Sequence, residues 1–294
     1  MRSNLPKVLQ PLAGRPLLAH VLDCAEALGA DDVCVVYGHG AEAVRNAFPD
    51  PTLRWALQAE QLGTGHAVQQ AMPDTPDDNR VLVLFGDVPL LTAHTCGRLI
   101  ETTPADDVAV LTVDMEEPTG YGRIIRDGDR VSRVVEHKDA SPEEKAVREI
   151  NTGVLLCPGG KLKRWLDNLS NDNSQGEYYL TDIVAMAVAE DVAVRGVKAE
   201  TWTEVMGIND KKQLAEAERA LQARLVDELM TQGVGFADPA RVDIRGSLKC
   251  GQDVFIDVNA VFEGDVEIGD GARIESNNLV RDSKIGAGTV VHSN

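Results

Sequence analysis

The stretch that decides the fold is residues 244–280, IRGSLKCGQDVFIDVNAVFEGDVEIGDGARIESNNLV, in which an apolar residue returns at every sixth position. The seven residues of this series are Ile244, Cys250, Ile256, Phe262, Ile268, Ile274 and Val280. Small and polar residues such as Gly264-Asp265 lie between them, so each hexad can form one short strand and a turn with the repeated side chain pointing inward. Stacked coils then bury one another's apolar residues. The pattern predicts a parallel β-helix over 236–294, with about eighteen residues in each coil.

A single long helix is expected before the repeats. Between residues 209 and 235 the apolar residues keep to one helical stripe, and glycines follow it. The stripe consists of Leu214, Ala217, Leu221, Leu225 and Leu229, and the glycines are Gly233 and Gly235. Residues 209–235 are therefore predicted to be a linker helix between two domains.

Residues 15–201 alternate short apolar runs with helical patterns. This alternation is typical of parallel strands covered by helices, so residues 1–208 are predicted to form a doubly wound, Rossmann-like α/β domain. The expected helices are 17–28, 62–72 and 180–189, and the expected strands are 33–37, 81–85, 108–113, 131–136 and 154–157. The charged residues 138–149 are expected to form a surface insertion.

The composition excludes several classes of protein. With 29 basic and 47 acidic side chains the formal charge is −18, which repels a nucleic-acid backbone over most of the surface. The five cysteines are widely spaced and odd in number, which fits neither a disulfide framework nor a zinc knuckle. Neither a signal sequence nor a membrane-spanning run is visible, so we expect a cytoplasmic protein.

Three polar side chains are of the kinds that bind a phosphate or a metal ion. Lys7 follows Pro6 and can meet a phosphate as a point charge, or it is a solvated surface lysine. Asp87 ends an apolar strand, where it can hold Mg²⁺ or cap the turn at Pro89. Asn209 can supply a second oxygen ligand, although alone it would pass as a helix N-cap.

The segment from Gln58 to Thr64 enters a helix through Gly63. Free backbone N–H groups and an amide can read a planar pyrimidine edge there, although such glycines usually serve only the backbone. His66 is interpreted as structural, because neither a Ser-His-Asp set nor a metal-binding pair of histidines is visible in the sequence.

Seven segments, in this order, closely resemble motifs of the sugar-phosphate nucleotidyltransferases. They are LPKVL (5–9), QAEQLGTGHA (58–67), GDVPL (86–90), TGYGRI (119–124), VEHK (135–138), EINTG (149–153) and GIND (207–210). With the helix and the hexapeptide repeats behind them, they resemble the bacterial bifunctional family that joins an N-acetylglucosamine-1-phosphate uridyltransferase to a glucosamine-1-phosphate acetyltransferase. YYLTD (178–182) also resembles a family segment, but two tyrosines at a helix start more often pack.

The resemblance implies a left-handed β-helix, a homotrimer formed through it, and synthesis of UDP-N-acetylglucosamine for cell-wall and lipopolysaccharide precursors. It assigns Lys7 and Asp87 to catalysis and Asp87 and Asn209 to Mg²⁺ binding. The substrates that it implies are UTP and N-acetylglucosamine 1-phosphate. The implied substrate-binding residues are Lys7, Gln58, Gly63, Thr64, Phe85, Gly86, Gly122, Glu136, Asn151 and Asn209. Among them Gly86, Gly122, Glu136 and Asn151 form the sugar-binding set; otherwise they would be turn glycines and exposed polar residues.

Two departures from the family pattern suggest a chain truncated at both ends. The family's first strand and its glycine-rich loop, L-A-A-G-x-G-T-R-M, are missing, because Met1 aligns with the final methionine of that loop. The later β-helix coils, which carry the family's acetyl-CoA site, are also missing. We therefore expect weak uridyl transfer, no acetyl transfer and a weakened trimer. Two alternatives stay open: an inactive fragment with only an assembly role, or a nucleotidyltransferase for another sugar phosphate.

Overall fold

The computed structural model describes residues 1–38 and 41–293. The chain forms two compact units, one of Met1–His20 with Gly207–Asn294 and one of Val21–Met206. The first twenty residues thus group with the predicted linker helix and the repeats, whereas the functional division at residues 208 and 235 stays a prediction. None of the helices in the described part of the chain is both long and apolar enough to cross a membrane.

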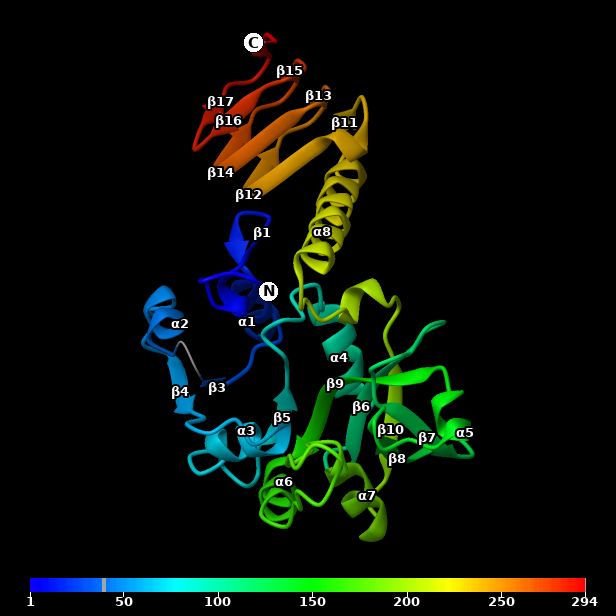
Figure 1. Ribbon diagram of the computed structural model, residues 1–294. Helices are drawn as coiled ribbons and strands as arrows, with labels where there is room; N and C mark the ends of the chain where they lie inside the picture. Colours follow the sequence, from blue (N-terminus) through cyan, green and yellow to red (C-terminus); the bar gives the residue numbers. More distant parts are fainter. Residues whose placement is uncertain (39–40, 294) are drawn as a thin grey trace. The chain divides into compact units, whose positions relative to one another are not determined.

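The Val21–Met206 unit has α/β architecture (Figure 1). Its strands are β3 (Val33–Tyr37), β4 (Leu53–Leu57), β5 (Arg80–Val83), β6 (Val108–Asp114), β7 (Arg123–Asp127), β8 (Arg130–Val135), β9 (Glu149–Pro158) and β10 (Val194–Lys198). Its helices are α2 (Ala41–Ala47), α3 (Thr64–Ala71), α4 (Ala93–Glu101), α5 (Pro142–Lys145), α6 (Gly159–Leu166), α7 (Asp182–Ala189) and the 3-10 helix η2 (Thr203–Val205). Helix α1 (Leu17–Ala27) precedes β3 and ends, as predicted, before Gly29, whose φ is +69°.

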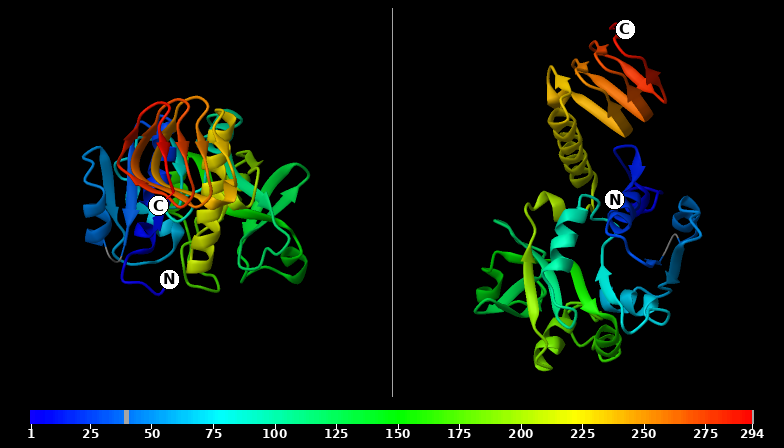
Figure 2. Two further views of the ribbon diagram at one scale, coloured as in Figure 1. Left: turned by 90° about the horizontal axis from the view of Figure 1, so that it is seen from above. Right: turned by 180° about the vertical axis from the view of Figure 1, so that it is seen from behind.

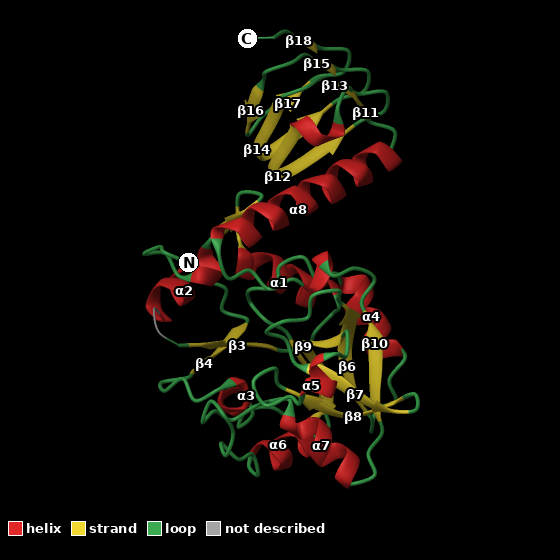
Figure 3. Ribbon diagram, turned by 45° about the vertical axis from the view of Figure 1, so that its right-hand side comes forward, coloured by secondary structure: helices red, strands yellow, loops and turns green. Residues whose placement is uncertain are grey.

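The main sheet of this unit is mixed rather than parallel (Figure 3). Its strand order is β10-β6-β9-β7-β8, with β5 also paired to β9. β10 and β6 are parallel, but β9 runs antiparallel to β5, β6 and β7. The α/β fold class and the presence of parallel strands are confirmed. The antiparallel direction of β9 was not predicted, because an apolar run reports that a strand is buried and not its direction.

Alternate residues of β6 enter two hydrophobic clusters, one on each face of the sheet. Val108 and Val110 pack in a cluster with residues of α6 and α7. Ala109 and Leu111 pack in a second cluster that includes residues of α1 and α4. Because side chains alternate along a strand, this continuous apolar run requires helices on both faces, as the predicted fold class does.

The hexapeptide repeats form the predicted left-handed β-helix, whose coils stack on one another (Figure 2). Its strands are β11 (Gly235–Phe236), β12 (Val242–Cys250), β13 (Phe255–Ile256), β14 (Ala260–Ile268), β15 (Arg273–Ile274), β16 (Leu279–Arg281), β17 (Lys284–Ile285) and β18 (Val290–Val291). β12 and β14 pair in parallel with Ile244 opposite Phe262, which is the predicted eighteen-residue coil. Six of the seven repeated residues are buried and Cys250 is partly buried.

Two details of the β-helix differ from the prediction. β12 and β14 each run through nine residues and so cover parts of two hexads, instead of one short strand per hexad. The last coil is one residue shorter, because Arg273 pairs with Val290. Both changes leave the buried positions in register, so the apolar interior continues.

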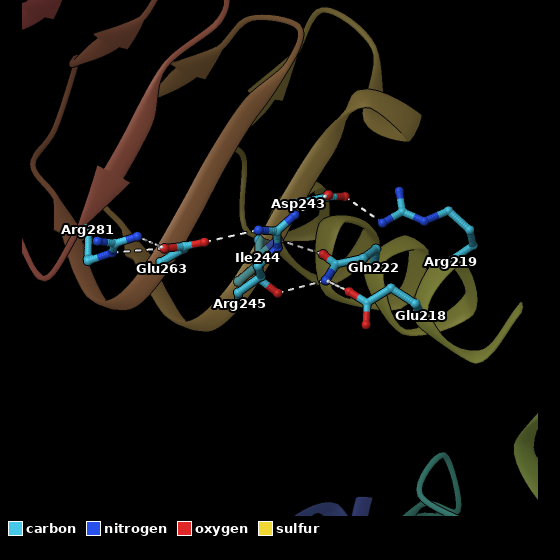
Figure 4. A network of polar contacts seen from close by, with 8 residues as sticks. All are labelled: Glu218, Arg219, Gln222, Asp243, Ile244, Arg245, Glu263 and Arg281. Atoms are coloured by element: carbon cyan, nitrogen blue, oxygen red, sulfur yellow. Dashed lines mark hydrogen bonds and ion pairs between the residues drawn. The ribbon is translucent and has the colours of Figure 1, made fainter. Parts of the chain in front are cut away.

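Helix α8 (Lys211–Thr231) closes the N-terminal end of the β-helix through a side chain that the stripe did not predict. Gln222 is 2% exposed. Its Oε1 accepts from the Ile244 N–H and its Nε2 donates to the Ile244 carbonyl, both at 2.7 Å (Figure 4). The amide thus pairs with β12 as a neighbouring strand would and leaves no unpaired edge group at Ile244.

The segment before α1 folds onto the same helix. The 3-10 helix η1 (Lys7–Leu9) leads into a hairpin of β1 (Pro11–Leu12) and β2 (Arg15–Pro16). At the hairpin turn, the Ala13 N–H donates to Glu218 Oε2 at 2.7 Å, and Glu218 Oε1 accepts from Gln222. These bonds account for the grouping of the first twenty residues with α8 and the repeats.

We predict that Gln222→Leu lowers the free energy of unfolding of the β-helix unit by about 2–4 kcal/mol, because two buried backbone groups of Ile244 lose their partners. Glu228→Leu is the control, since Glu228 is exposed on the same helix, and we expect a change within about 0.5 kcal/mol. Urea denaturation followed by circular dichroism measures both variants. If Gln222→Leu is as stable as the wild type, water replaces the Gln222 amide at β12.

Candidate active site

Three predicted sugar-binding residues come together because three strands share one register. Arg123 of β7 pairs with Val135 of β8 and with Ile150 of β9. The residues one position along are therefore also neighbours, and the Asn151 N–H donates to the Gly122 carbonyl at 2.9 Å. Because side chains alternate between faces, Gly122, Glu136 and Asn151 lie together on the face opposite Arg123, Val135 and Ile150.

These three residues line a pocket of about 200 Å³ in the Val21–Met206 unit. The predicted residues Thr64 and Phe85 line it as well. The remaining lining residues are Val110, Gly120, Tyr121, Val134, Thr152, Gly153, Leu155, Leu180, Thr181 and Val184. Apolar side chains with a few polar groups among them suit a small ligand that has one apolar face and several hydroxyls, such as a sugar.

Gly153 lets the wall of the pocket form. Its φ is +90°, and a Cβ at this position would lie 2.6 Å from the Phe85 ring. The Gly153 N–H donates to Asn151 Oδ1 at 3.1 Å. Since a backbone N–H can only donate, this bond assigns the amide oxygen and leaves Asn151 Nδ2 as a donor for a ligand.

Glu136 is the acidic residue of the pocket. Its Oε1 accepts from the Thr181 hydroxyl at 3.0 Å. Burial raises the pKa of Glu136, the Thr181 hydrogen bond opposes this effect, and the nearby Asp182, Asp139 and Glu177 add to it. The Glu136 carboxyl is thus a desolvated hydrogen-bonding group in the wall of the pocket.

The predicted pyrimidine-binding segment is tied to the loop before α7. Gly63 has φ +113°, and a Cβ there would lie 2.6 Å from the Tyr178 carbonyl oxygen. Thr64 Oγ1 accepts from the Leu180 N–H at 3.1 Å. Gln58 Nε2 donates to the Gly63 carbonyl at 3.0 Å and lies 3.1 Å from His66 Nδ1. His66 therefore supports Gln58, which fits its structural interpretation.

Gly86 and Asp87 follow Phe85 in the loop after β5. The loop is turned by a hydrogen bond from the Val88 N–H to the Phe85 carbonyl at 3.0 Å. Neither residue lines the pocket. Burial raises the pKa of the pocket residue Tyr121, and the Asp87 charge adds to this effect.

Lys7 and Asn209 meet in the other unit. Lys7 Nζ donates to Asn209 Oδ1 at 2.9 Å. The N-cap of α8 is Asp210, whose side chain accepts from the Lys212 and Gln213 N–H groups. The alternative interpretation of Asn209 as the N-cap is therefore wrong, and its amide oxygen faces a cation.

The predicted metal ligands fit Mg²⁺ by their chemistry. In residues 1–38 and 41–293 no three His, Cys, Asp or Glu side chains gather as a metal cage. Mg²⁺ is usually held by one or two protein oxygens and by substrate phosphates, rather than by such a cage. A carboxylate such as that of Asp87 and an amide oxygen such as that of Asn209 are ligands of the kind that suits this mode.

The sequence prediction missed several lining residues, Thr181 and Gly153 among them. The 178–182 segment was expected to pack, and Tyr179 does so, with 6% exposure. Thr181 nevertheless lines the pocket and bonds Glu136. Only the likeness of YYLTD to a family segment could have signalled it, because no spacing links residue 181 to residue 136.

Comparison with known proteins finds two family models that match parts of the chain. Residues 1–151 match the MobA-like NTP transferase domain, and residues 248–282 match the bacterial transferase hexapeptide, six repeats. A crystal structure of UDP-glucose pyrophosphorylase with UDP-glucose shares the fold, with a TM-score of 0.57 over 75% of this chain and 91% of that one, at 15% identity.

Curated relatives match nearly the whole chain. Bifunctional protein GlmU of Azoarcus sp. (strain BH72) is 57% identical over 99% of this chain and 65% of its own length. Those of Aromatoleum aromaticum and Thiobacillus denitrificans are each 55% identical over 98% of this chain, and over 64% and 63% of their own lengths. The chain thus spans a little under two thirds of these relatives.

We predict that Glu136→Gln stabilises the protein in a pH-dependent way. In the unfolded chain Glu136 has its ordinary pKa of 4.5, and in the folded state burial raises this pKa. At a pH between the two pKa values the folded state therefore binds more protons than the unfolded chain. Stability therefore falls as pH rises from about 4.5 through the raised pKa. The gain in Tm of Glu136→Gln over wild type should be small at pH 5 and larger at pH 8, with roughly 2–4 °C per kcal/mol gained.

The control is Glu143→Gln. Glu143 is exposed, and hydrogen bonds from its own backbone and from Ser141 lower its pKa. This substitution should bring no gain at pH 8. Scanning calorimetry at the two pH values measures both variants, and a Glu136→Gln gain that does not grow with pH would rule out an ionised, desolvated Glu136.

Proposed function

Since the chain belongs to the MobA-like NTP transferase family, we propose that it transfers a uridylyl group from UTP to N-acetylglucosamine 1-phosphate. A phosphate oxygen of the sugar phosphate attacks the α-phosphorus of UTP, the bond to the β-phosphate breaks, and pyrophosphate leaves. The product is UDP-N-acetylglucosamine. The proposal rests on one pocket that is lined by five of the ten residues that the family resemblance assigns to substrate binding. They are Thr64, Phe85, Gly122, Glu136 and Asn151.

The pocket residues are proposed to bind the N-acetyl sugar. Asn151 Nδ2 donates to a sugar oxygen, because Gly153 occupies its Oδ1. Glu136 accepts from a sugar hydroxyl through its second carboxylate oxygen, because Thr181 bonds the first. Gly122 lets the ligand approach the backbone, since it has no side chain beside Glu136.

Gln58, Gly63 and Thr64 are proposed to bind the uracil ring, whereas Gly86 stays with the proposed sugar-binding residues, although it does not line the pocket. The Gln58 amide N–H₂ is engaged by the Gly63 carbonyl and His66. Its oxygen is therefore the group that would accept from a pyrimidine N–H.

The reaction joins two polyanions, so cations must balance the charge. Lys7 is proposed to neutralise a phosphate, and Asp87 and Asn209 to hold Mg²⁺. Magnesium, when bound, supplies Lewis-acid stabilisation of the charge at the reacting phosphates. The Lys7–Asn209 hydrogen bond supports this set, because it keeps the ammonium next to one of the proposed ligands.

The hexapeptide unit is proposed to carry the assembly role, as a homotrimer in the cytoplasm. The competing proposal of a different sugar substrate, and that of a fragment without enzymatic function, are outcomes of the tests below.

We predict that the protein binds UDP-N-acetylglucosamine more tightly than UDP-glucose. Asn151→Ala should raise the Kd for UDP-N-acetylglucosamine by roughly tenfold or more, because one oriented hydrogen bond is lost in a desolvated site. Isothermal titration calorimetry measures each Kd. The control is Asn168→Ala, at an exposed residue outside the pocket. Tighter binding of UDP-glucose would identify another sugar, and binding of neither ligand would favour a purely structural role.

We predict that Asp87→Asn lowers the magnesium-dependent rate of pyrophosphate release by roughly a hundredfold or more, because metal stabilisation contributes several kcal/mol to such transfers. Its Kd for UDP-N-acetylglucosamine should change less. Asp78→Asn, at an exposed aspartate, is the matched control. If both variants retain the wild-type rate, Asp87 holds no essential metal.

A further inference from the structure

Arg123 is the bulkiest fully buried side chain of the described residues, with 1% exposure. Its Nε has no hydrogen-bond partner. Within residues 1–38 and 41–293 it forms no ion pair with an acid, and burial lowers its pKa. Burying an arginine without a carboxylate is costly, so the contacts that it does make need a reason.

Those contacts reach three segments of the chain, two of which flank the pocket. One terminal nitrogen, Nη1, donates to the carbonyl of Tyr121. The other, Nη2, donates to His137 Nδ1 at 3.3 Å and to the Lys145 carbonyl at 3.5 Å. Tyr121 lines the pocket next to Gly122, and His137 directly follows Glu136. A single planar guanidinium therefore bridges the two edges of the subsite.

The strand register keeps Arg123 away from any ligand. Arg123 pairs with Val135 and Ile150, one position before Glu136 and Asn151 on their strands. Its side chain therefore lies on the other face of the sheet, and Arg123 is absent from the pocket lining. Any effect on binding must pass through the residues that it holds.

We propose that Arg123 is the positioning residue of the sugar-phosphate subsite. It sets the separation between the Gly120–Gly122 loop and the Glu136 carboxylate by holding the backbone of Tyr121 and the ring of His137. This inference deepens the proposed function, because the ligand whose binding it governs is the sugar phosphate and not UTP.

The structure supplies a reporter for the loop that Arg123 holds. The rings of Tyr121 and Trp202 meet edge to face, with 5.2 Å between centroids. The protein has three tryptophans, so a Trp202→Phe difference spectrum isolates the emission of Trp202. This signal needs no ligand and follows the position of Tyr121.

The test compares Arg123→Met with Arg126→Met. Arg126 is on the same strand, but it pairs with Glu149 at 2.6 Å and does not line the pocket. We expect Arg123→Met to shift the Trp202 emission and to raise KM for N-acetylglucosamine 1-phosphate roughly tenfold, the equivalent of one oriented hydrogen bond, with KM for UTP within about twofold. Arg126→Met should change thermal stability without changing the ratio of the two KM values.

His137→Leu is the second variant, for use if Arg123→Met does not fold, since it removes one acceptor of the guanidinium and leaves the arginine in place. We expect it to change the same two readouts in the same direction, to a smaller degree. Unchanged Trp202 emission in a folded variant overturns the inference whether or not a ligand binds, and so does an equal rise in both KM values. A shifted emission in a protein that binds neither substrate would instead support the positioning of the loop while contradicting the proposed function.

Discussion

The register of β7, β8 and β9 is the constraint on which the site depends. A strand has a side-chain period of two, so one shared register places Gly122, Glu136 and Asn151 on one face of the sheet. A slip of one residue would exchange this set for Arg123 and its neighbours. Arg123, which is buried and forms no ion pair within the described part of the chain, lies on the reverse face of the same three strands. Its hydrogen bonds hold the segments that continue from them.

In the other unit, the backbone groups at the first edge of the β-helix also need hydrogen-bond partners. An eighteen-residue coil brings like residues above one another, so each coil covers the next, but the first coil has no predecessor. Gln222 supplies the missing pairing at Ile244 and, through Glu218, also bonds the hairpin that follows Lys7. One helix thus serves the end of the β-helix and the segment that carries a proposed phosphate-binding lysine.

Much of this architecture could be predicted because its signals are local. The hexad period gave the coil length, and Gly29 with its φ of +69° ends a helix where the pattern stops. The antiparallel course of β9 could not be predicted, since an apolar run carries no direction. Thr181 and Arg123 could not be found either, because their roles arise from partners that only the fold brings to them, and a basic residue beside Gly122 would ordinarily be expected at the surface.

The most direct test of the account is a crystal structure of the protein with UDP-N-acetylglucosamine. We predict that the N-acetyl sugar lies on the face formed by Gly122, Glu136 and Asn151, with Asn151 Nδ2 donating to it. Arg123 should remain on the other face of the sheet, without contact to the ligand. A sugar bound elsewhere, or one that contacts Arg123 directly, would contradict the claim that this strand register builds the site.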